Sequence, residues 1–433
     1  MQPSFPVTLL AVLLLLSTCS VAQQQIILYN PKAGSPGPGD EKITSRWAPL
    51  KFEALKAPLL KIPKRKNDSP FFCDELIQYK DGYIINSITT SPGAGTIDTR
   101  CDFFYIDIKQ DKFYKLAITG VDTIESVIVS GEKLFVSGKK GGASVILQIE
   151  NGQTLIINVA IAGANRIIGD NSWIKLCMYE GALYAMDKNG LYRYSGETWQ
   201  HTAVFSIDSF YTSQLHFRKC KTVIPTENIK MYNNKLYFLQ EVLQERDCYL
   251  LEYDLDKKDG LVNFWDRYDI KDNYNKEINS YTILDDGSVL IGASRLWETY
   301  LLMKEKGDSL AVLVFNNGIN DGENRDAQIK ARKAIMVDSI MYIAGDNGMF
   351  KIENNICSPV ALFTNGTQVI KDKDGDEHFD FYPRCFERVS ADNYLIGGQF
   401  GGLYLVNIKD KKIIPLDDVD YDKITTLNIS GIK

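Results

Sequence analysis

The stretch from Asp372 to Asp380, DKDGDEHFD, holds the side chains best suited to bind an ion. Carboxylates stand at positions 1, 3, 5 and 9, and Gly375 allows a tight turn at position 4. Oxygen ligands that converge in this way suit a hard cation such as Ca²⁺. The predicted ligands are Asp372, Asp374, Asp376, Asp380 and a backbone carbonyl near His378. The alternative is a solvated acidic loop without an ion, since Asp-rich turns form without one.

Other catalytic chemistry has little support in the sequence. The chain has three histidines, His201, His216 and His378, and no HExxH helix, GxSxG elbow, P-loop or Cys/His zinc spacing. Paired carboxylates for glycoside cleavage leave no trace in sequence spacing, because the fold alone decides which two meet. The predicted protein is therefore not an enzyme, with an acidic hydrolase or lyase as the alternative.

A repeat of about 52 residues organises the chain from Phe71 to Leu416. In each repeat a short apolar strand is followed by a turn and a second strand marked by a bulky residue. These markers are spaced by 51, 49, 53, 53, 52 and 53 residues: Ile84, Phe135, Tyr184, Tyr237, Leu290, Tyr342 and Leu395. A period near 50 with four strands per repeat is typical of a β-propeller.

Turn and glycine patterns agree with this repeat. Asp81-Gly82, Glu180-Gly181, Asn233-Asn234 and Asp286-Gly287 fall at the same hairpin, where positive φ is favoured. A Gly-apolar-aromatic sequence opens the third strand of three repeats, as in Gly190-Leu191-Tyr192. The sequence predicts an all-β, seven-bladed propeller of four-stranded blades.

With this repeat the chain resembles the broad β-propeller superfamily, without the signature of a particular subfamily. A ring is expected to be closed by strands from both chain ends, because closure removes edge strands, and either Ile26–Tyr29 or Ile424–Ile429 is the expected closing strand. An eighth, incomplete blade is the alternative. The Asp372–Asp380 loop resembles the calcium loop of integrin-type propeller repeats, which implies a Ca²⁺ cofactor, although Glu377 stands where those loops usually have Gly.

Cysteine positions follow the repeat. Cys73 and Cys101 precede the first strand and open the third strand of one blade, and Cys220 and Cys248 do the same in another. Both positions should lie at the same end of a blade, so we predict disulfides Cys73–Cys101 and Cys220–Cys248. The pairing of Cys357 with Cys385 is left open, and Cys177 is expected to be a buried free thiol.

The first 22 residues have the features of a signal peptide. An apolar core runs from Leu9 to Leu16, and Ser20-Val21-Ala22 provides small residues before a cleavage point. No apolar run is long enough to span a bilayer. We therefore predict a secreted, extracellular glycoprotein, with sequons at Asn67, Asn365 and Asn428. The expected organisation is a signal peptide (1–22), a polar N-terminal extension (23–68) and the propeller (69–433).

The net charge of the chain and the composition of its loops limit which classes of partner are expected. The net charge is −6 and the one dense basic stretch is Lys61–Lys66, so nucleic acid is not an expected partner. Long connections should gather on one face of the ring, where aromatic and Arg side chains make a recognition surface. That predicted binding face comprises Phe210, Tyr211, His216, Arg218, Arg295, Trp297, Arg325, Phe381 and Tyr382. We expect it to bind an extracellular protein or glycan; a calcium-associated matrix protein is a further alternative.

Overall fold

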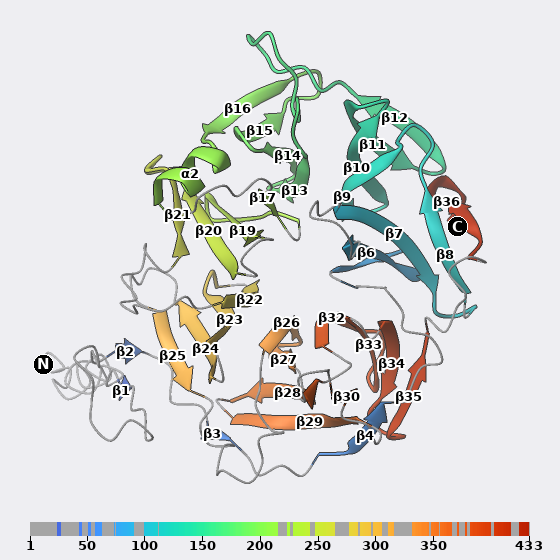
Figure 1. Cartoon of the computed structure of the whole chain (residues 1–433), viewed down its shortest axis with the longest axis vertical. Coiled ribbons are helices and arrows are strands. Elements are labelled where there is room, and N and C mark those ends of the chain that lie inside the picture. The colour runs from blue at the N-terminus through green and yellow to red at the C-terminus, as the bar shows by residue number, and fades with distance from the viewer. Residues whose placement is uncertain are drawn as a thin grey trace, which may run out of the picture.

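Seven antiparallel sheets stand around a common axis in the computed structural model (Figure 1). The structure describes residues 24–26, 43–45, 51–52, 57–62, 73, 75–90, 99–110, 112–214, 223–225, 228–242, 247–264, 277–284, 286–295, 298–304, 311–315, 331–345, 348–354, 356–365, 370–371, 377–378, 382–399, 402–416 and 424–432. Each sheet is a blade whose four strands follow one another along the chain. The predicted all-β seven-bladed propeller is confirmed.

The strand bounds show the repeat directly. Blade 1 comprises β5 (Glu75–Tyr79), β6 (Gly82–Thr90), β7 (Thr99–Asp107) and β8 (Lys112–Ala117); blade 2 comprises β9 (Thr123–Ser130), β10 (Lys133–Lys140), β11 (Ala143–Glu150) and β12 (Gln153–Ile157). Blade 3 comprises β13 (Lys175–Tyr179), β14 (Ala182–Asp187), β15 (Gly190–Tyr194) and β16 (Trp199–Val204). Blade 4 comprises β17 (Val223–Pro225), β18 (Lys230–Tyr232), β19 (Lys235–Val242), β20 (Asp247–Asp254) and β21 (Leu261–Asn263).

The remaining blades follow the same order. Blade 5 comprises β22 (Glu277–Ile283), β23 (Val289–Arg295), β24 (Glu298–Lys304) and β25 (Ala311–Phe315). Blade 6 comprises β26 (Ala331–Val337), β27 (Ile340–Gly345), β28 (Gly348–Glu353) and β29 (Ile356–Asn365), and blade 7 comprises β32 (Tyr382–Arg388), β33 (Asn393–Gln399), β34 (Gly402–Asn407) and β35 (Lys412–Pro415). The described helices are α2 (Ile207–Gln214), between blades 3 and 4, and the 3-10 turn η4 (Ile429–Gly431).

The seven marker residues all lie on the second strand of their blade and are all buried. Alternate residues of these strands face the two neighbouring blades, so the core consists of apolar clusters between adjacent blades. Ile84 packs with Leu134 and Val136 of blade 2, and Tyr342 packs with Tyr394 and Ile396 of blade 7. Burial between blades explains why this position is always bulky.

Turn residues at the hairpins and glycines at the third strands recur for two different reasons. At the hairpins, positive φ occurs at Glu180, Asn233 and Gly287, as predicted, but in blade 1 it falls at Lys80 rather than at Asp81-Gly82. At the third strands, Gly190 is required by close approach, because a Cβ there would lie 2.3 Å from the carbonyl oxygen of Ala203. The repeated glycine therefore marks a tight contact between the third and fourth strands.

The chain ends add strands outside the ring. β36 (Thr426–Asn428) pairs in parallel with β8, and β3 (Lys51–Phe52) and β4 (Leu59–Ile62) pair in parallel with β29. In Figure 1 these strands lie on the outer edges of blades 1 and 6. Of the two predicted closing strands, the one near the C-terminus joins the end of the chain to blade 1, as an outer fifth strand, whereas β1 (Gln24–Ile26) pairs with β2 (Ile43–Ser45). The last strand extends blade 1 instead of starting an eighth blade.

The N-terminal extension contributes to the core of blade 6. Leu60 on β4 is buried with Ala361 and Phe386. A further pair, β1 (Gln24–Ile26) and β2 (Ile43–Ser45), forms a two-stranded sheet. The predicted signal peptide, residues 1–22, lies outside the described residues. No helix among the described residues is long and apolar enough to cross a membrane.

Candidate functional site

The innermost strands of the blades carry β-bulges at matching places. One extra residue is inserted opposite the second strand at Glu125 in β9, Asn279 in β22, Arg332 in β26 and Arg384 in β32. In blade 4, Pro225 pairs with Gln240 and Lys230 with Tyr237, so the pairing is interrupted by a wider bulge that separates β17 from β18. Bulges bend a strand and change the direction of its side chains, so the innermost strands are irregular in at least these five blades.

Asn228, in the bulge of blade 4, reaches across the axis to blade 1. Its side-chain amide donates to both carboxylate oxygens of Glu75, at 3.1 and 3.0 Å, and to the backbone carbonyl of Val127 in blade 2 at 2.8 Å. Its own oxygen accepts from the hydroxyl of Ser126, which in turn accepts from the backbone N–H of Leu176 in blade 3 at 3.1 Å. One amide therefore joins blades 1, 2 and 4, and a serine extends the chain of bonds to blade 3.

Charged side chains surround this crossing. Burial and the nearby charge of Glu75 raise the pKa of Glu387 in blade 7 to about 7, against the opposing effect of Lys333 and Lys230. The ammonium of Lys230 lies 4.3 Å from the ring centroid of Tyr281, a cation–π contact. The middle of the axis is thus a place where carboxylates and ammonium groups of four blades interact at short range.

A cavity of about 680 Å³ lies on one side of the crossing. Its lining begins at Glu75, Asn228 and Lys230 and continues to Tyr232 and Leu284, at the ends of the innermost strands. The cavity therefore lies toward the hairpins that join first and second strands. Its remaining wall is mostly aliphatic: Leu76, Ile77, Val127, Ile128, Val129, Cys177, Met178, Ile229, Met231 and Ile283, with Gln78.

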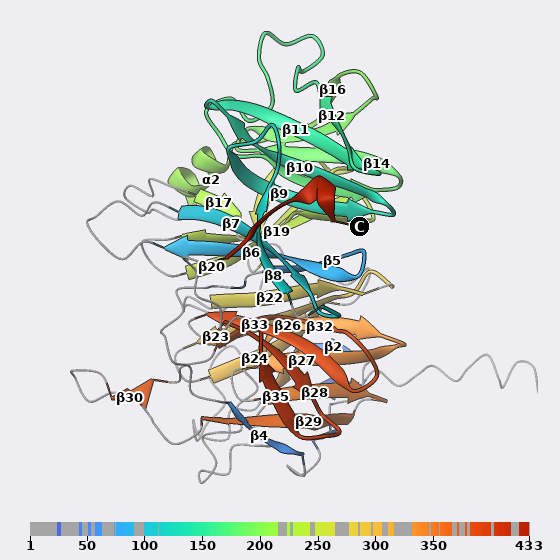
Figure 2. The same ribbon diagram turned by 90° about the vertical axis from the view of Figure 1, so that its right-hand side faces the viewer.

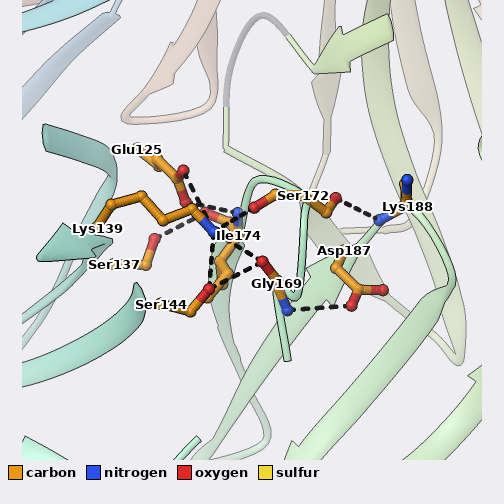
Figure 3. Close-up of polar contacts among 9 residues, drawn as sticks. All are labelled: Glu125, Ser137, Lys139, Ser144, Gly169, Ser172, Ile174, Asp187 and Lys188. Atoms are coloured by element: carbon orange, nitrogen blue, oxygen red, sulfur yellow. Dashed lines mark hydrogen bonds and ion pairs between the residues drawn. The ribbon is translucent and has the colours of Figure 1, made fainter. Parts of the chain in front are cut away.

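A second polar cluster fastens blade 2 to blade 3 (Figure 3). The ammonium of Lys139 donates to the hydroxyl of Ser144 and the carbonyl of Gly169, both at 2.7 Å, and to the carbonyl of Ser172, and it lies 4.0 Å from a carboxylate oxygen of Glu125. Burial raises the pKa of Glu125, and the Lys139 charge lowers it. With four acceptors around it, this ammonium holds the β12–β13 connection against the blade.

The same connection is bonded to blade 3. The backbone N–H of Gly169 donates to Asp187 at 3.1 Å, and the other oxygen of Asp187 accepts from the hydroxyl of Tyr192 at 3.1 Å (Figure 3 shows the first contact). Burial and the Asp187 charge raise the pKa of Tyr192 well above its usual range. All these groups bond one another, so this cluster is structural and the axial one is the better candidate site.

Most residues predicted as sites lie where side chains are not described. Asp372, Asp374, Asp376 and Asp380 are outside the described residues. β30 (Ile370–Lys371) precedes this loop and pairs with β31 (Glu377–His378) within it, with Ile370 opposite His378. Among the described residues, no group of three or more His, Cys, Asp or Glu side chains can hold a metal ion. The calcium site stays a prediction.

The predicted binding face is described at few points. Phe210 lies on α2 and is 6% exposed, because it packs with Phe205 and Ile207, so its side chain belongs to the core. The backbones of Tyr211, Arg295 and Tyr382 lie in α2, β23 and β32. The remaining residues of the face lie outside the described part of the chain: His216, Arg218, Trp297, Arg325 and Phe381. This face also stays a prediction.

The cysteine predictions have mixed outcomes. Cys177 is a buried free thiol, as predicted, and burial raises its pKa well above the usual range. The side chains of Cys101 and Cys248 are not described and Cys220 is outside the described residues, so both predicted bridges stay predictions. Cys73 and Cys385 are also thiols, not joined by a disulfide in the structure, and lie side by side, with the two sulfurs 3.1 Å apart.

The axial residues carry a sequence signal that our sequence analysis missed. The position nine residues before each second-strand marker is polar in five repeats. Those residues are Glu75, Ser126, Lys175, Asn228 and Lys333, and the other two are Tyr281 and Phe386. A polar residue recurring on a strand that is otherwise apolar indicates a wall facing water or a ligand.

This chain is a β-propeller of seven blades by its own strand topology. No known protein family and no curated protein matches the sequence. Solved structures with a similar arrangement include an inactive virginiamycin B lyase from Staphylococcus aureus with quinupristin (TM-score 0.44, 9% identity, covering 78% of this chain and 96% of that one). Others are the WD40 propeller domain of Doa1 (0.37, 10%, 79% and 94%) and the N-terminal domain of Nup159 (0.32, 10%, 83% and 92%).

Proposed function

We propose that this chain is a secreted, non-enzymatic propeller that binds a protein partner, and that an apolar side chain of the partner enters the axial cavity. The observation that carries the proposal is the cavity itself, with its aliphatic wall and its polar end at Glu75, Asn228 and Lys230. A volume of about 680 Å³ lies in the range of pockets that hold ligands.

The hydrogen bonding of Glu75 favours binding over catalysis. Both of its oxygens already accept from Asn228, and it is the one carboxyl group among the described residues that line the cavity. Glycoside hydrolysis requires two carboxyl groups on opposite sides of the scissile bond. The cavity thiol, Cys177, is a poor nucleophile because burial raises its pKa and keeps it protonated.

The wall favours a protein partner over a glycan. Each Å² of apolar surface buried against Ile77, Met231 or Ile283 contributes about 25 cal/mol, whereas sugar hydroxyl groups would lose hydrogen bonds there. The partner can also contact the loop-rich face at the other end of the blades, which stays part of the proposal. Its segment should combine a large aliphatic or aromatic side chain with a charged group that reaches Lys230 or Glu75.

A displayed random-peptide library selected on the purified chain tests this proposal. Met231→Trp fills the cavity, and Leu155→Trp is its matched control on the outer strand of blade 2, where Leu155 is 60% exposed. We expect enriched peptides to lose at least tenfold in affinity, by calorimetry, for the first variant and to keep it for the second. The proposal fails if no peptide is enriched, or if Met231→Trp binds the enriched peptides as tightly as the unmodified chain.

Export is tested separately. The chain is expressed with its first 22 residues in a secreting eukaryotic cell, and the protein in the medium is sequenced from its N-terminus. We expect the mature protein to begin at Gln23. Retention of the chain inside the cell would refute the secretory part of the proposal and leave the binding test unaffected.

A hydrolase or lyase is the second candidate function, and one observation favours it. Glu387 has a pKa raised to about 7 beside the charge of Glu75, a property of general acids. A panel of neutral and acidic polysaccharides, assayed for new reducing ends and for unsaturated products, decides between the functions. Turnover that disappears in Glu387→Gln and persists in the exposed control Glu197→Gln would establish the enzyme; the binding proposal expects no turnover.

A further inference from the structure

Blade 1 and blade 7 meet at the seam where the ring closes. The four inner-to-outer strands of each of these blades come from one continuous stretch of chain, and the chain that follows blade 7 adds only β36 across the seam, on the outer edge of blade 1. The closure rests on packing, where Leu76 and Phe104 meet Leu395 and Leu403, and on a hydrogen bond from the Cys73 backbone N–H to the Gly398 carbonyl at 3.3 Å. Because β36 lies on the outer edge, these contacts hold the inner side of the seam.

The two cysteines at this seam are in contact. The sulfurs of Cys73 and Cys385 lie 3.1 Å apart, 312 residues apart in sequence, and both residues are at most 1% exposed. Gly397 makes room for the pair, since a Cβ there would lie 2.3 Å from the Cys73 sulfur and 2.9 Å from the Cys385 sulfur. Side-chain contact and a cleared space place both sulfurs within reach of a bond of about 2.05 Å.

Sheet order separates Cys73 from the partner that sequence spacing suggested. Cys101 pairs with Ile88 on β6, and β6 lies between β5 and β7. Two strand spacings amount to about 9.5 Å, whereas the Cα atoms of a disulfide usually lie about 4.4–6.8 Å apart. Cys357 lies on β29, the fourth strand of blade 6, whereas Cys385 lies on β32, the innermost strand of blade 7.

We propose that Cys73 and Cys385 form a disulfide that closes the propeller ring covalently between blades 1 and 7. The two thiols lose two protons and two electrons as the sulfur–sulfur bond forms. A disulfide oxidant, either a protein disulfide or glutathione disulfide, takes up both and is released as two thiols. The inference rests on the proposed export, because a secretory compartment supplies this oxidant.

Covalent closure should act on the opening of the ring. No described strand of blade 7 pairs with a strand of blade 1, so the two blades can separate at the inner side of the seam, far from β36, and the bond prevents this. Cross-linking residues so distant in sequence also removes much of the freedom of the unfolded chain. Reduction should therefore lower the melting temperature by about 5 °C.

Peptide mapping tests the bond in the full-length secreted protein. Free thiols are alkylated in acid, the chain is digested without reductant, and linked peptides are identified by mass spectrometry. We expect the Cys73 peptide to be linked to the Cys385 peptide. Recovery of alkylated Cys73, or of Cys73 linked to Cys101, overturns the inference.

The same mapping after incubation of reduced, purified protein in a glutathione redox buffer separates this inference from export. If the chain is retained in cells but the Cys73–Cys385 link forms in the buffer, the export proposal fails and this inference stands. If the link forms in neither sample, the inference fails whatever the location of the protein.

Two variants provide a thermal readout. Cys385→Ser should melt about 5 °C lower than the oxidised chain and should no longer respond to reductant. Cys357→Ser is the matched control, a buried cysteine away from the seam, and should keep the response. An unchanged response in a folded Cys385→Ser protein contradicts the proposal; if that variant does not fold, the mapping of the unmodified chain decides.

Discussion

The side-chain amide of Asn228 donates to both carboxylate oxygens of Glu75, at 3.1 and 3.0 Å, across the axis of the ring. Blades 1 and 4, which are 153 residues apart at this contact, are therefore bonded directly as well as through the blades between them. This contact holds Glu75 and Asn228 together at the polar end of the cavity, so the shape of the cavity depends on the positions of blades 1 and 4. Figure 2 shows the propeller from the side, with β5 and β6 of blade 1 near the middle of the view.

Removing the crossing amide should destabilise the ring. Asn228→Ala leaves the Glu75 carboxylate and the Ser126 hydroxyl without this partner, at a cost of about 1–3 kcal/mol in the free energy of unfolding. Urea denaturation measures the change, and Gln153→Ala on the exposed outer strand of blade 2 is the control. Equal stability of the two variants would show that the crossing contributes nothing.

Stability should depend on the protonation of Glu387. Its pKa rises from 4.5 in the unfolded chain to about 7 in the folded one, so the folded chain binds the proton more tightly. Its contribution to the free energy of unfolding is therefore greatest below pH 4.5, falls as the pH rises, and is lost above about pH 7.

Glu387→Gln removes this dependence. Relative to the unmodified chain, the variant should gain about 1–2 kcal/mol between pH 5 and pH 8, after allowance for partial solvent screening. Urea denaturation at both pH values measures the difference, with the exposed Glu197→Gln as control. A constant difference between variant and unmodified chain across this range would contradict the assigned charge state.

The Lys139 ammonium should be essential for the seam between blades 2 and 3. Lys139→Met removes the donor to Gly169, Ser172 and Ser144 while keeping much of the side-chain volume, and we expect a loss of about 2–4 kcal/mol. Thermal and urea unfolding measure it. Lys140→Met, at the exposed neighbouring position, should change stability by less than about 0.5 kcal/mol.

The acidic loop Asp372–Asp380 is predicted to bind calcium. Ca²⁺ at 100 times its dissociation constant would add about 2.7 kcal/mol to the stability of the folded chain. We expect the melting temperature to rise with Ca²⁺, the rise to be lost in Asp374→Ala, and the rise to persist in Asp420→Ala. Absence of heat in calorimetry at millimolar Ca²⁺ would show that the loop is acidic without a metal role.

The repeat could be predicted from the sequence because its causes are local. A marker such as Tyr237 is bulky wherever a second strand is buried between blades, and Gly190 recurs wherever the fourth strand approaches the third. Turn residues such as Asn233 occur where the backbone adopts a positive φ. These signals act within one repeat, so their spacing gave the strand order, the blade number and the all-β class.

Only the tertiary structure decided how the repeats meet. Closing a ring brings the first blade against the last and opposite inner strands across the axis, so Cys73 contacts Cys385 and Asn228 contacts Glu75 over separations that no local pattern encodes. The tertiary structure also decided where the strands from the chain ends pair: β36 and β4 pair with the outer strands of blades 1 and 6, which already have four strands. Sequence periodicity specifies each blade, whereas contacts between blades depend on the geometry of the closed ring.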